Sequence, residues 1–432
     1  MKLKFSNVGK ISEAEIEVNS ITVIAGNNDT GKSTVGKLLY AIPTALNLFT
    51  SEFWFQSKRR AILDELKNLA RWVERETATK YTTKYMYFLE DSEWNPDEKS
   101  LDRHIRELVV EIEKEVLQKD YNNKKQIELI CKNLLDYVNS SSHTGELKFL
   151  VIQDLLLTEF SSTLTSEFQK NTATKIRMEE DNGDIIDCTF LDNKLQKSSE
   201  VKVTRDFSKT FYIDNPFILD RISISDNRIH LNFNNVYHEH KHTEQLIKSL
   251  SIRETEQNYF DQLLQKEKIE QLFTSVIDGH IKISRKGYQY HTDQFNEPLN
   301  MESVSTGIKS FAIIKLLLEL GHLHNSEFLI LDEPEIHLHP DWQLKYAELI
   351  VLLSREYNMR IVLTTHSPYF VEAIELYSKL HKIDEDVRYY KTEPDGKMSK
   401  IIDVTHCIEK LYEDMARPFR KLEELEDELD AE

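Results

Sequence analysis

The sequence predicts an α/β fold in which a mixed sheet with flanking helices is interrupted by a large, mainly helical insertion. Short apolar runs end in polar loops near the N-terminus and again after residue 300. Such runs are typical of buried parallel strands. Between residues 51 and 168, in contrast, apolar residues recur every three or four positions, which is the spacing of one helix face. The sheet is therefore expected to form from two distant parts of the chain.

Length and composition are those of a soluble, folded protein. The chain has 432 residues, of which 40% are hydrophobic, enough for one large domain with insertions or for two or three domains. It has no apolar run of about 18 residues and no apolar N-terminal leader, so we expect no membrane partner and a cytoplasmic location. Cys131, Cys188 and Cys407 are widely spaced and are expected to be reduced thiols.

The formal net charge of −19 argues against broad, nonspecific wrapping of nucleic acid, although it leaves a local basic patch or a basic partner open. The run Lys58–Arg60 is a short basic cluster, either a solvated helix face or a contact to a DNA backbone. The acidic C-terminal sequence has Leu422, Leu425 and Leu429 at helical spacing. It is either a solvated helix end or a docking peptide for a basic partner.

The order of the expected elements divides the chain into five segments. A hairpin signal at Asp181–Asp184 lies in β-rich sequence, and a series of helix, strand, helix, strand, helix begins at about residue 303. We expect residues 1–50 to form the first half of the α/β domain, 51–170 a helical insertion, 171–280 a mixed β and helical lobe that continues the domain, 281–405 its second half, and 406–432 an acidic C-terminal helix.

Residues 26–33 match the phosphate-binding pattern G-x-x-x-x-G-K-[ST] at every fixed position, directly after the apolar run Ile21–Ala25. A strand would thus lead into a loop of backbone amides at a helix N-terminus, which favours phosphate. Lys32 would reach the outer phosphates and Ser33 would hold Mg²⁺. The alternative is a glycine loop that only turns the chain. The residues expected to bind ATP here are Gly26, Asn27, Asn28, Asp29, Thr30, Gly31, Lys32, Ser33 and Thr34.

A second motif follows the apolar run Phe328–Leu331. Asp332, at the end of this expected strand, can hold Mg²⁺, and Glu333 can polarise a water molecule for attack on the γ-phosphate. A third apolar run, Ile361–Leu363, leads through two threonines to His366. This histidine can hydrogen-bond the γ-phosphate and sense its presence. The alternative is a histidine whose hydrogen bonds are satisfied at a strand end.

A fourth motif is the turn of small residues at 303–310, which contains Ser305, Thr306 and Gly307 and precedes an apolar helix. Such a turn at a helix N-terminus is another anion-binding site. Because the chain already has a phosphate loop, this second site indicates that two copies share nucleotide. Each copy would complete the site of the other.

The order of these motifs resembles the ABC-type ATPases of the SMC, RecF and OLD group, and residues 333–340 are similar to the prokaryotic defence and repair members. The resemblance rests on residues 1–45 and 300–370. It implies an ABC-type P-loop ATPase head that binds ATP and Mg²⁺ and forms homodimers or larger homo-oligomers. It implies the roles given above for Lys32, Ser33, Asp332, Glu333 and His366. It also implies that Ser305 and Gly307 cap nucleotide bound to the opposite protomer, and that His337 and His339 lie in a turn that crosses the dimer interface.

Two features depart from that family. Val304 and Thr306 replace the leucine and glycine of its strongest signature. The glutamine that usually links Mg²⁺ to the helical lobe has no counterpart beyond the Asp214-Asn215 turn, which has different side chains. Hydrolysis is therefore expected to be slow, or ATP to act mainly as a conformational ligand. The histidines at 238, 240 and 242 are interpreted as a polar loop, with a metal site as the alternative.

OLD-type proteins carry a nuclease domain after the ATPase, and the 66 residues after His366 leave no room for one, so we expect any nuclease on another chain. The pattern resembles the ATPase subunit of the Septu antiphage system, whose family partner is an HNH nuclease. ATPase subunits of PARIS-like and retron-associated systems are alternatives. We expect an ATPase subunit of an antiphage complex that gates a nuclease or other effector by nucleotide-dependent dimerisation and reaches DNA through the complex. The alternative is a RecF- or SMC-like repair ATPase that clamps DNA on binding ATP. A transporter motor is disfavoured by the large insertion.

Overall fold

The computed structural model of the chain contains two compact units, Met1–Asn47 with Phe149–Glu432, and Leu48–Lys148. Residues 149–170, which the sequence assigns to the helical insertion, lie in the first unit. They belong there because the Leu164 carbonyl accepts from the Gly9 N–H at 3.0 Å, beside the first strand of the sheet. The structure describes residues 1–48, 58–59, 61–69, 98–115, 124–139, 145–196, 198–205, 207–225, 228–231, 240–251, 267–284, 287–323, 327–415, 422, 424–426 and 429.

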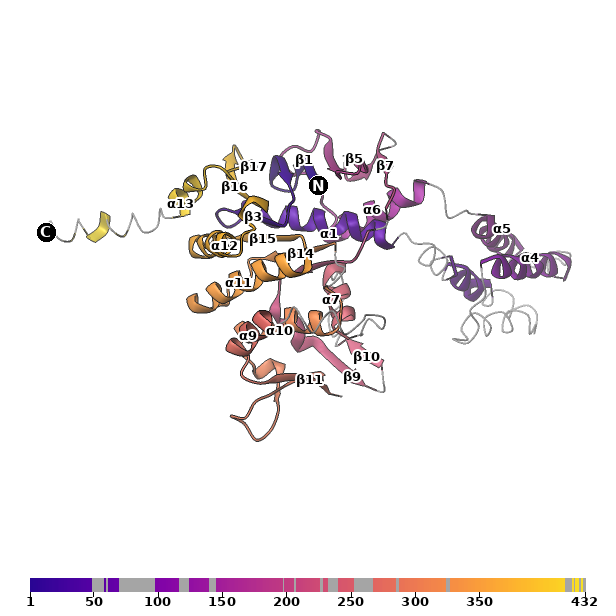
Figure 1. Ribbon diagram of the computed structural model, residues 1–432. Coiled ribbons are helices and arrows are strands. Elements are labelled where there is room, and N and C mark those ends of the chain that lie inside the picture. Colours follow the sequence, from indigo (N-terminus) through magenta and orange to yellow (C-terminus); the bar gives the residue numbers. More distant parts are fainter. Residues whose placement is uncertain are drawn as a thin grey trace. The chain divides into compact units, whose positions relative to one another are not determined.

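The first unit is built on a mixed sheet of twelve strands in the order β6-β5-β4-β1-β2-β17-β16-β3-β15-β14-β8, with β7 beside β5 (Figure 1). The predicted fold class, a mixed sheet with flanking helices, is confirmed. The predicted hairpin joins β4 to β5, which pair antiparallel. The strands are β1 (Lys2–Val8), β2 (Ile11–Glu17), β3 (Ile21–Ala25), β4 (Thr174–Glu179), β5 (Ile185–Leu191), β6 (Lys194–Leu195), β7 (Glu200–Lys202), β8 (Thr210–Ile213), β14 (Phe328–Asp332), β15 (Ile361–Thr365), β16 (Val387–Asp395) and β17 (Met398–Asp403).

The parallel strands of this sheet bring the predicted motifs together. β3 and β15 are buried along their whole length, as expected for strands that helices cover on both faces. Ala25 pairs with Thr365, and Asp332 pairs with Thr364, in parallel register. The carboxyl ends of β3, β15 and β14 therefore lie side by side, and the residues that follow these strands share one edge.

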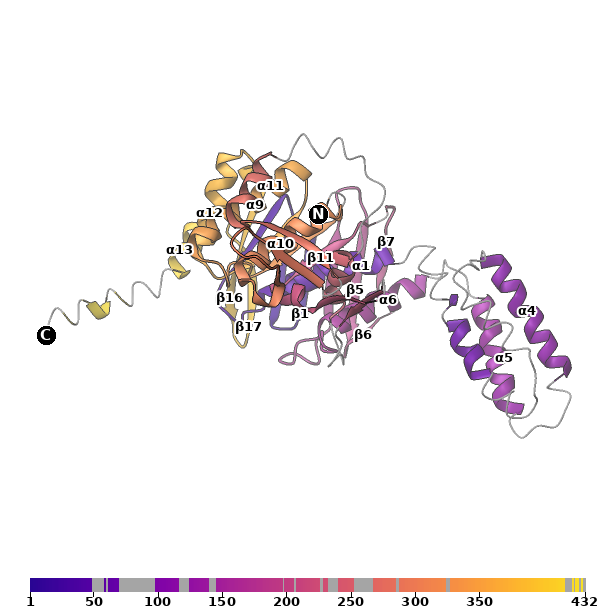
Figure 2. The ribbon, with the colours of Figure 1, turned by 90° about the horizontal axis from the view of Figure 1, so that it is seen from below.

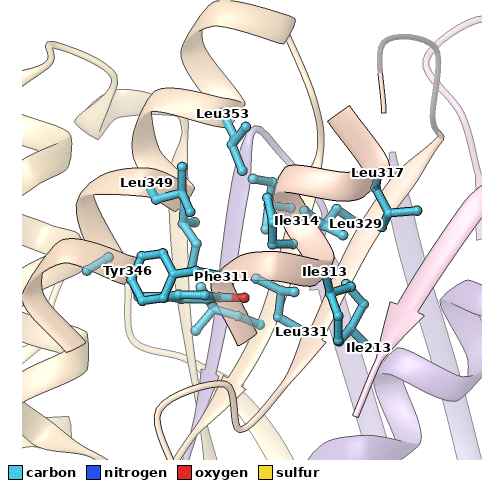
Figure 3. Packing of buried hydrophobic residues seen from close by; sticks show 14 of the residues in the cluster. Ile213, Phe311, Ile313, Ile314, Leu317, Leu329, Leu331, Tyr346, Leu349 and Leu353 are labelled. Atoms are coloured by element: carbon cyan, nitrogen blue, oxygen red, sulfur yellow. The ribbon is translucent and has the colours of Figure 1, made fainter. Parts of the chain in front are cut away.

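Helices pack on the sheet through apolar faces. Figure 3 shows side chains of α10 and α11 meeting those of β14. The rings of Phe311 and Tyr346 meet edge to face there, with centroids 4.9 Å apart. Figure 1 shows α11 beside α12. The helices are α1 (Lys32–Leu48), α6 (Gly145–Glu159), α7 (Lys241–Ser251), α9 (Glu267–Val276), α10 (Thr306–Glu319), α11 (Pro340–Tyr357), α12 (Pro368–Leu380) and α13 (Glu409–Met415).

Two smaller antiparallel sheets, β9-β10 and β11-β12-β13, also belong to the first unit. In Figure 1, β9, β10 and β11 lie with α7, α9 and α10 on one side of the main sheet. The remaining elements are β9 (Ile222–Ser225), β10 (Arg228–Leu231), β11 (His280–Ser284), β12 (Gly287–His291), β13 (Leu299–Asn300) and the 3-10 turns η1 (Pro216–Arg221), η2 (Met301–Ser303) and η3 (Asp384–Asp386).

The second unit is helical, as its apolar spacing predicts. It contains α4 (Glu98–Glu115) and α5 (Lys124–Asn139), which lie side by side in Figure 2, and both contribute to a core of their own. Within the basic cluster, Lys58 itself is neither solvated nor available to DNA, whereas Arg59 is partly exposed. Its side chain is 1% exposed, and its Nζ lies 2.8 Å from Asp102 Oδ1. Arg60 lies outside the described residues.

The acidic C-terminal segment contains α13, and the side chains of Leu422, Leu425 and Leu429 beyond it are exposed. Among the described residues, no helix combines the length and the apolar character needed to cross a membrane.

Candidate functional site

The phosphate loop connects β3 to α1, and its shape requires glycine at two positions. A Cβ on Gly26, which has φ 154°, would lie 1.9 Å from Thr392 Oγ1 of β16. A Cβ on Gly31, which has φ 88°, would lie 2.9 Å from Ile11 Cδ1 of β2. Both φ values are ones that side chains disfavour. Thr392 also supports the loop, because its hydroxyl donates to Thr30 Oγ1 at 2.8 Å.

The tip of the loop is exposed, and both its own polar groups and Lys10, whose Nζ contacts Asp29, hold it. Asn27, Asn28 and Asp29 are exposed, and Asp29 has a left-handed φ of 62°. The Thr30 hydroxyl donates to the Asn27 carbonyl at 2.8 Å. Thr34 is buried in the first turn of α1. The predicted strand, loop and helix are therefore present in the predicted order.

Lys32 is the buried cation of the loop. Its side chain is 4% exposed, and its Nζ donates to the Asn27 carbonyl at 2.9 Å. The same Nζ lies 3.0 Å from Glu333 Oε1. A lysine enclosed in this way has few alternative conformations, so its charge stays between the loop and the end of β14.

Asp332 accepts hydrogen bonds from three hydroxyl groups. Ser33 Oγ donates to its Oδ1 at 3.1 Å, Thr364 donates to the same oxygen, and Tyr212 donates to Oδ2 at 2.8 Å. Burial, followed by the charge of Asp332, raises the pKa of Tyr212 well above its usual value. Hydroxyl and carboxylate oxygens are ligands that Mg²⁺ prefers, so Ser33 and Asp332 fit this ion. Tyr212 and Thr364 are not among the residues expected from the sequence to form the site.

Glu333 lies between the two basic groups of the site. It has a left-handed φ of 48°, and its backbone N–H donates to the Thr364 carbonyl at 3.1 Å. Its Oε1 contacts Lys32, and its Oε2 lies 3.7 Å from His366 Nδ1. A non-glycine residue in this conformation is strained, and such residues are concentrated at functional sites. The predicted catalytic pair, Glu333 and His366, is therefore close in space.

Glu335 is a third carboxylate at this edge, after Asp332 and Glu333, and no role was expected for it from the sequence. It is 2% exposed, and its Oε1 accepts from the Thr365 hydroxyl at 2.5 Å and from the His366 backbone N–H at 3.1 Å. Burial raises the pKa of the Glu335 carboxyl, and these hydrogen bonds oppose that rise.

A pocket opens beside these residues. Asp214 and Asn215, the turn that stands in place of the family's glutamine, line it together with Ser33 and Asp332. The Asp214-Asn215 turn therefore shares a pocket with the expected Mg²⁺ ligands, but with a carboxylate and a shorter amide. The lining residues are Ser33, Ile213, Asp214, Asn215, Pro216, Ser310, Leu331, Asp332, Glu333, Pro334, Ile336, His337 and Tyr346.

His242 is buried between two carboxylates, which corrects the expectation of a polar loop. Its side chain is 1% exposed, its Nδ1 lies 2.6 Å from Glu159 Oε2, and its Nε2 lies 3.2 Å from Asp214 Oδ2. Burial opposes a charge on this ring, but hydrogen bonds with Asp214 and Glu159 outweigh burial and raise the pKa of His242 to about 9. The ring centroid lies 4.6 Å from that of Tyr212. His238 lies outside the described residues.

The small-residue turn lies at the N-terminus of α10, as predicted. Ser305 is the N-cap residue, and its side chain accepts from the Ile308 N–H at 3.5 Å. A Cβ on Gly307 would lie 2.8 Å from Trp342 Cε3 of α11. The Thr306 carbonyl accepts from Ser310 inside the helix. Within one chain, no interaction found among the described residues joins these three residues to the phosphate loop.

Residues 1–371 match the model of the AAA ATPase domain family. The chain belongs to that family. It is 31% identical over 108 residues to the Septu protein PtuA of Bacillus thuringiensis, across 22% of this chain and 27% of that protein. It is 29% identical over 126 residues to a Geobacter sulfurreducens protein provisionally named an ABC transporter ATP-binding protein, across 27% of this chain and 44% of that protein. The chain thus spans less than half the length of each of these relatives.

Two solved structures of SMC head domains are also similar to this chain. One is an SMC head bound to the C-winged helix domain of ScpA, with a TM-score of 0.43 and 11% identity over 93% of this chain and 97% of that one. The other is the SMC head domain from Thermotoga maritima, with a TM-score of 0.35 and 12% identity over 93% of this chain and 98% of that one. The sequence match over residues 1–371 carries the family assignment.

The contact between Gly26 and Thr392 gives a testable prediction. Gly26→Ala should weaken ATP binding at least about tenfold, because a 1.4 kcal/mol distortion of the loop already has that effect. The double variant Gly26→Ala/Thr392→Ala should recover part of the affinity, because it removes the oxygen that the new methyl group would meet. Thr392→Ala alone is the control. Titration calorimetry with ATP checks all three, and a double variant no better than Gly26→Ala would contradict the prediction.

Proposed function

We propose that this chain is the ATP-binding and ATP-hydrolysing subunit of a prokaryotic antiphage defence complex. Nucleotide-dependent pairing of two copies would gate a partner nuclease of the HNH type or another effector. The ATPase part is supported by one observation above all: Lys32, Glu333 and His366 are linked by contacts of 3.0 and 3.7 Å, next to Ser33 and Asp332. The defence part is supported by the partial identity to the Septu protein PtuA.

Each of these residues has a separate task in hydrolysis. Lys32 would exchange its contact with Glu333 for the outer phosphates of ATP. Ser33 and Asp332 would hold Mg²⁺, which would neutralise charge on the phosphates. Glu333, once released from Lys32, orients the attacking water and accepts its proton. His366 donates a hydrogen bond to the γ-phosphate. Lys32 contacts one carboxylate oxygen of Glu333 and His366 faces the other, so the two basic groups approach Glu333 through different oxygens.

A second copy of the chain is needed to cover the nucleotide in this scheme. The first N–H groups of α10 have no carbonyl acceptor within the helix, as at every helix N-terminus, and such groups attract phosphate. Ser305, Thr306 and Gly307 lie at this N-terminus and make no contact, among the described residues, with the phosphate loop of their own chain. We therefore assign them to nucleotide held by the partner protomer.

The alternative of a DNA-clamping repair ATPase has less support. The net charge of −19 opposes binding to a DNA backbone. Lys58, the first residue of the basic cluster, is engaged by Asp102 inside a helical core. A protein partner that carries the DNA-directed activity is therefore the better fit.

Glu333→Gln tests the ATPase assignment. The amide keeps the size of the side chain but cannot accept a proton, so we expect turnover to fall at least about 100-fold, the scale of a lost general base. ATP binding should persist, and the nucleotide should remain unhydrolysed in the isolated protein. Glu372→Gln, an exposed position on α12, is the matched control. Unchanged phosphate release by Glu333→Gln would remove Glu333 from its role.

Ser305→Arg tests the shared site. A long side chain at this exposed N-cap should block closure of two copies over ATP while leaving each copy folded. Sedimentation with ATP in the Glu333→Gln background measures closure. Ser305→Ala is the control, because it removes the cap, at a cost of about 1 kcal/mol, but adds no bulk. Normal ATP-dependent dimers of Ser305→Arg would contradict the shared-site scheme.

The partner is tested by purifying the native complex through this chain. We expect a nuclease to co-purify and its DNA cleavage to change when the chain carries Lys32→Ala, which should prevent nucleotide binding. Fluorescence anisotropy with duplex DNA at physiological salt provides the comparison. Tight binding of bare DNA by the isolated chain, without a bound nuclease, would favour the repair function instead.

A further inference from the structure

Glu335 is a buried carboxylate at the site that the hydrolysis scheme leaves without a task. Its Oε1 accepts from two donors, the Thr365 hydroxyl and the His366 backbone N–H. Its Oε2 is also buried but has no hydrogen-bond partner among the residues that the structure describes. Burial of an unsatisfied carboxylate oxygen costs free energy.

The ring of His366 lies beside Glu335 Oε1, the oxygen that already accepts these two hydrogen bonds. Its Nδ1 lies 3.6 Å from Glu335 Oε1 and 3.7 Å from Glu333 Oε2. Both carboxylates thus face the same ring nitrogen, and both can accept its proton but cannot donate one when ionised. Nδ1 is therefore the ring nitrogen turned toward the two carboxylates. Nε2 is the ring nitrogen left to face a phosphate oxygen, because the two nitrogens of an imidazole ring point in different directions.

The two carboxylates, Glu333 and Glu335, differ in their other contacts and in their freedom to move. Glu333 has Lys32 as a second partner and must turn toward water during hydrolysis. Glu335 is 2% exposed and is held by Thr365, so it cannot follow. When Glu333 moves, Glu335 is the carboxylate that still faces Nδ1. His366 would then keep its orientation while the bond to the γ-phosphate of ATP is cleaved.

We propose that Glu335 is a positioning residue for ATP hydrolysis, which fixes the backbone at His366 and holds ring nitrogen Nδ1 inward so that Nε2 faces the terminal phosphate. This inference rests on the proposed ATPase function. Glu335 acts through His366 and does not itself touch ATP or the attacking water. Its charge, as well as its hydrogen bonds, is part of the role.

A double-mutant cycle with His366 tests this inference. Glu335→Gln keeps the shape and an acceptor oxygen but removes the charge, and His366→Ala removes the ring. We expect Glu335→Gln to lower kcat about tenfold, which corresponds to 1.36 kcal/mol of transition-state stabilisation, with little change in KM for ATP. In the His366→Ala background, Glu335→Gln should have no further effect on kcat, because residues that act through one another are not additive.

The outcomes separate this inference from the proposed function. Equal losses from Glu335→Gln with and without His366, or no loss at all, would overturn the positioning role, while loss of turnover in Glu333→Gln would still support the ATPase. If His366→Ala hydrolyses ATP normally, the role of His366 and that of Glu335 fail together. Thermal unfolding and ATP titration establish that each variant is folded. If Glu335→Gln does not fold, Glu335→Asp, which withdraws the charge by one methylene, should show the same dependence on His366.

Discussion

The site of this protein depends on the parallel register of β3, β15 and β14. Because Ala25 lies opposite Thr365, and Thr364 opposite Asp332, the loops that leave these strands start from one edge. Ser33 thus contacts Asp332 at 3.1 Å although 299 residues separate them in the sequence. A slip of the register by one residue would turn alternate side chains to the other face of the sheet and separate these groups.

Charge balance is the second constraint on this edge. Asp332, Glu333 and Glu335 are close together, and Lys32 and His366 are the basic groups that contact them. Carboxylates grouped in this way repel a triphosphate, so a divalent cation is the natural complement of the site. The same excess of negative charge gives His366 two possible partners, Glu333 and Glu335. Exchange between those partners is a simple physical way to connect nucleotide binding with a change in the positions of the side chains.

Local patterns account for the parts of the fold that could be predicted. The strands at 21–25, 328–332 and 361–365 and the phosphate loop were predictable because apolar runs and glycine spacing act over a few residues. The end of the insertion was not predictable in the same way. Residues 149–170 have apolar side chains at helical spacing, and that spacing is the same whichever core the helix joins. The burial of Lys58 has the same explanation, because a helix pattern does not reveal which side chain lies opposite a cation.

The sequence by itself determined the motifs, their order and the residue types at Lys32, Asp332 and Glu333. Only the tertiary structure decided which other groups support them. Thr392 meets the loop from 362 residues away, and His242 meets Glu159 from 83 residues away. Such pairs leave no periodic signal, because they are set by the packing of strands and helices onto one another rather than by neighbours along the chain.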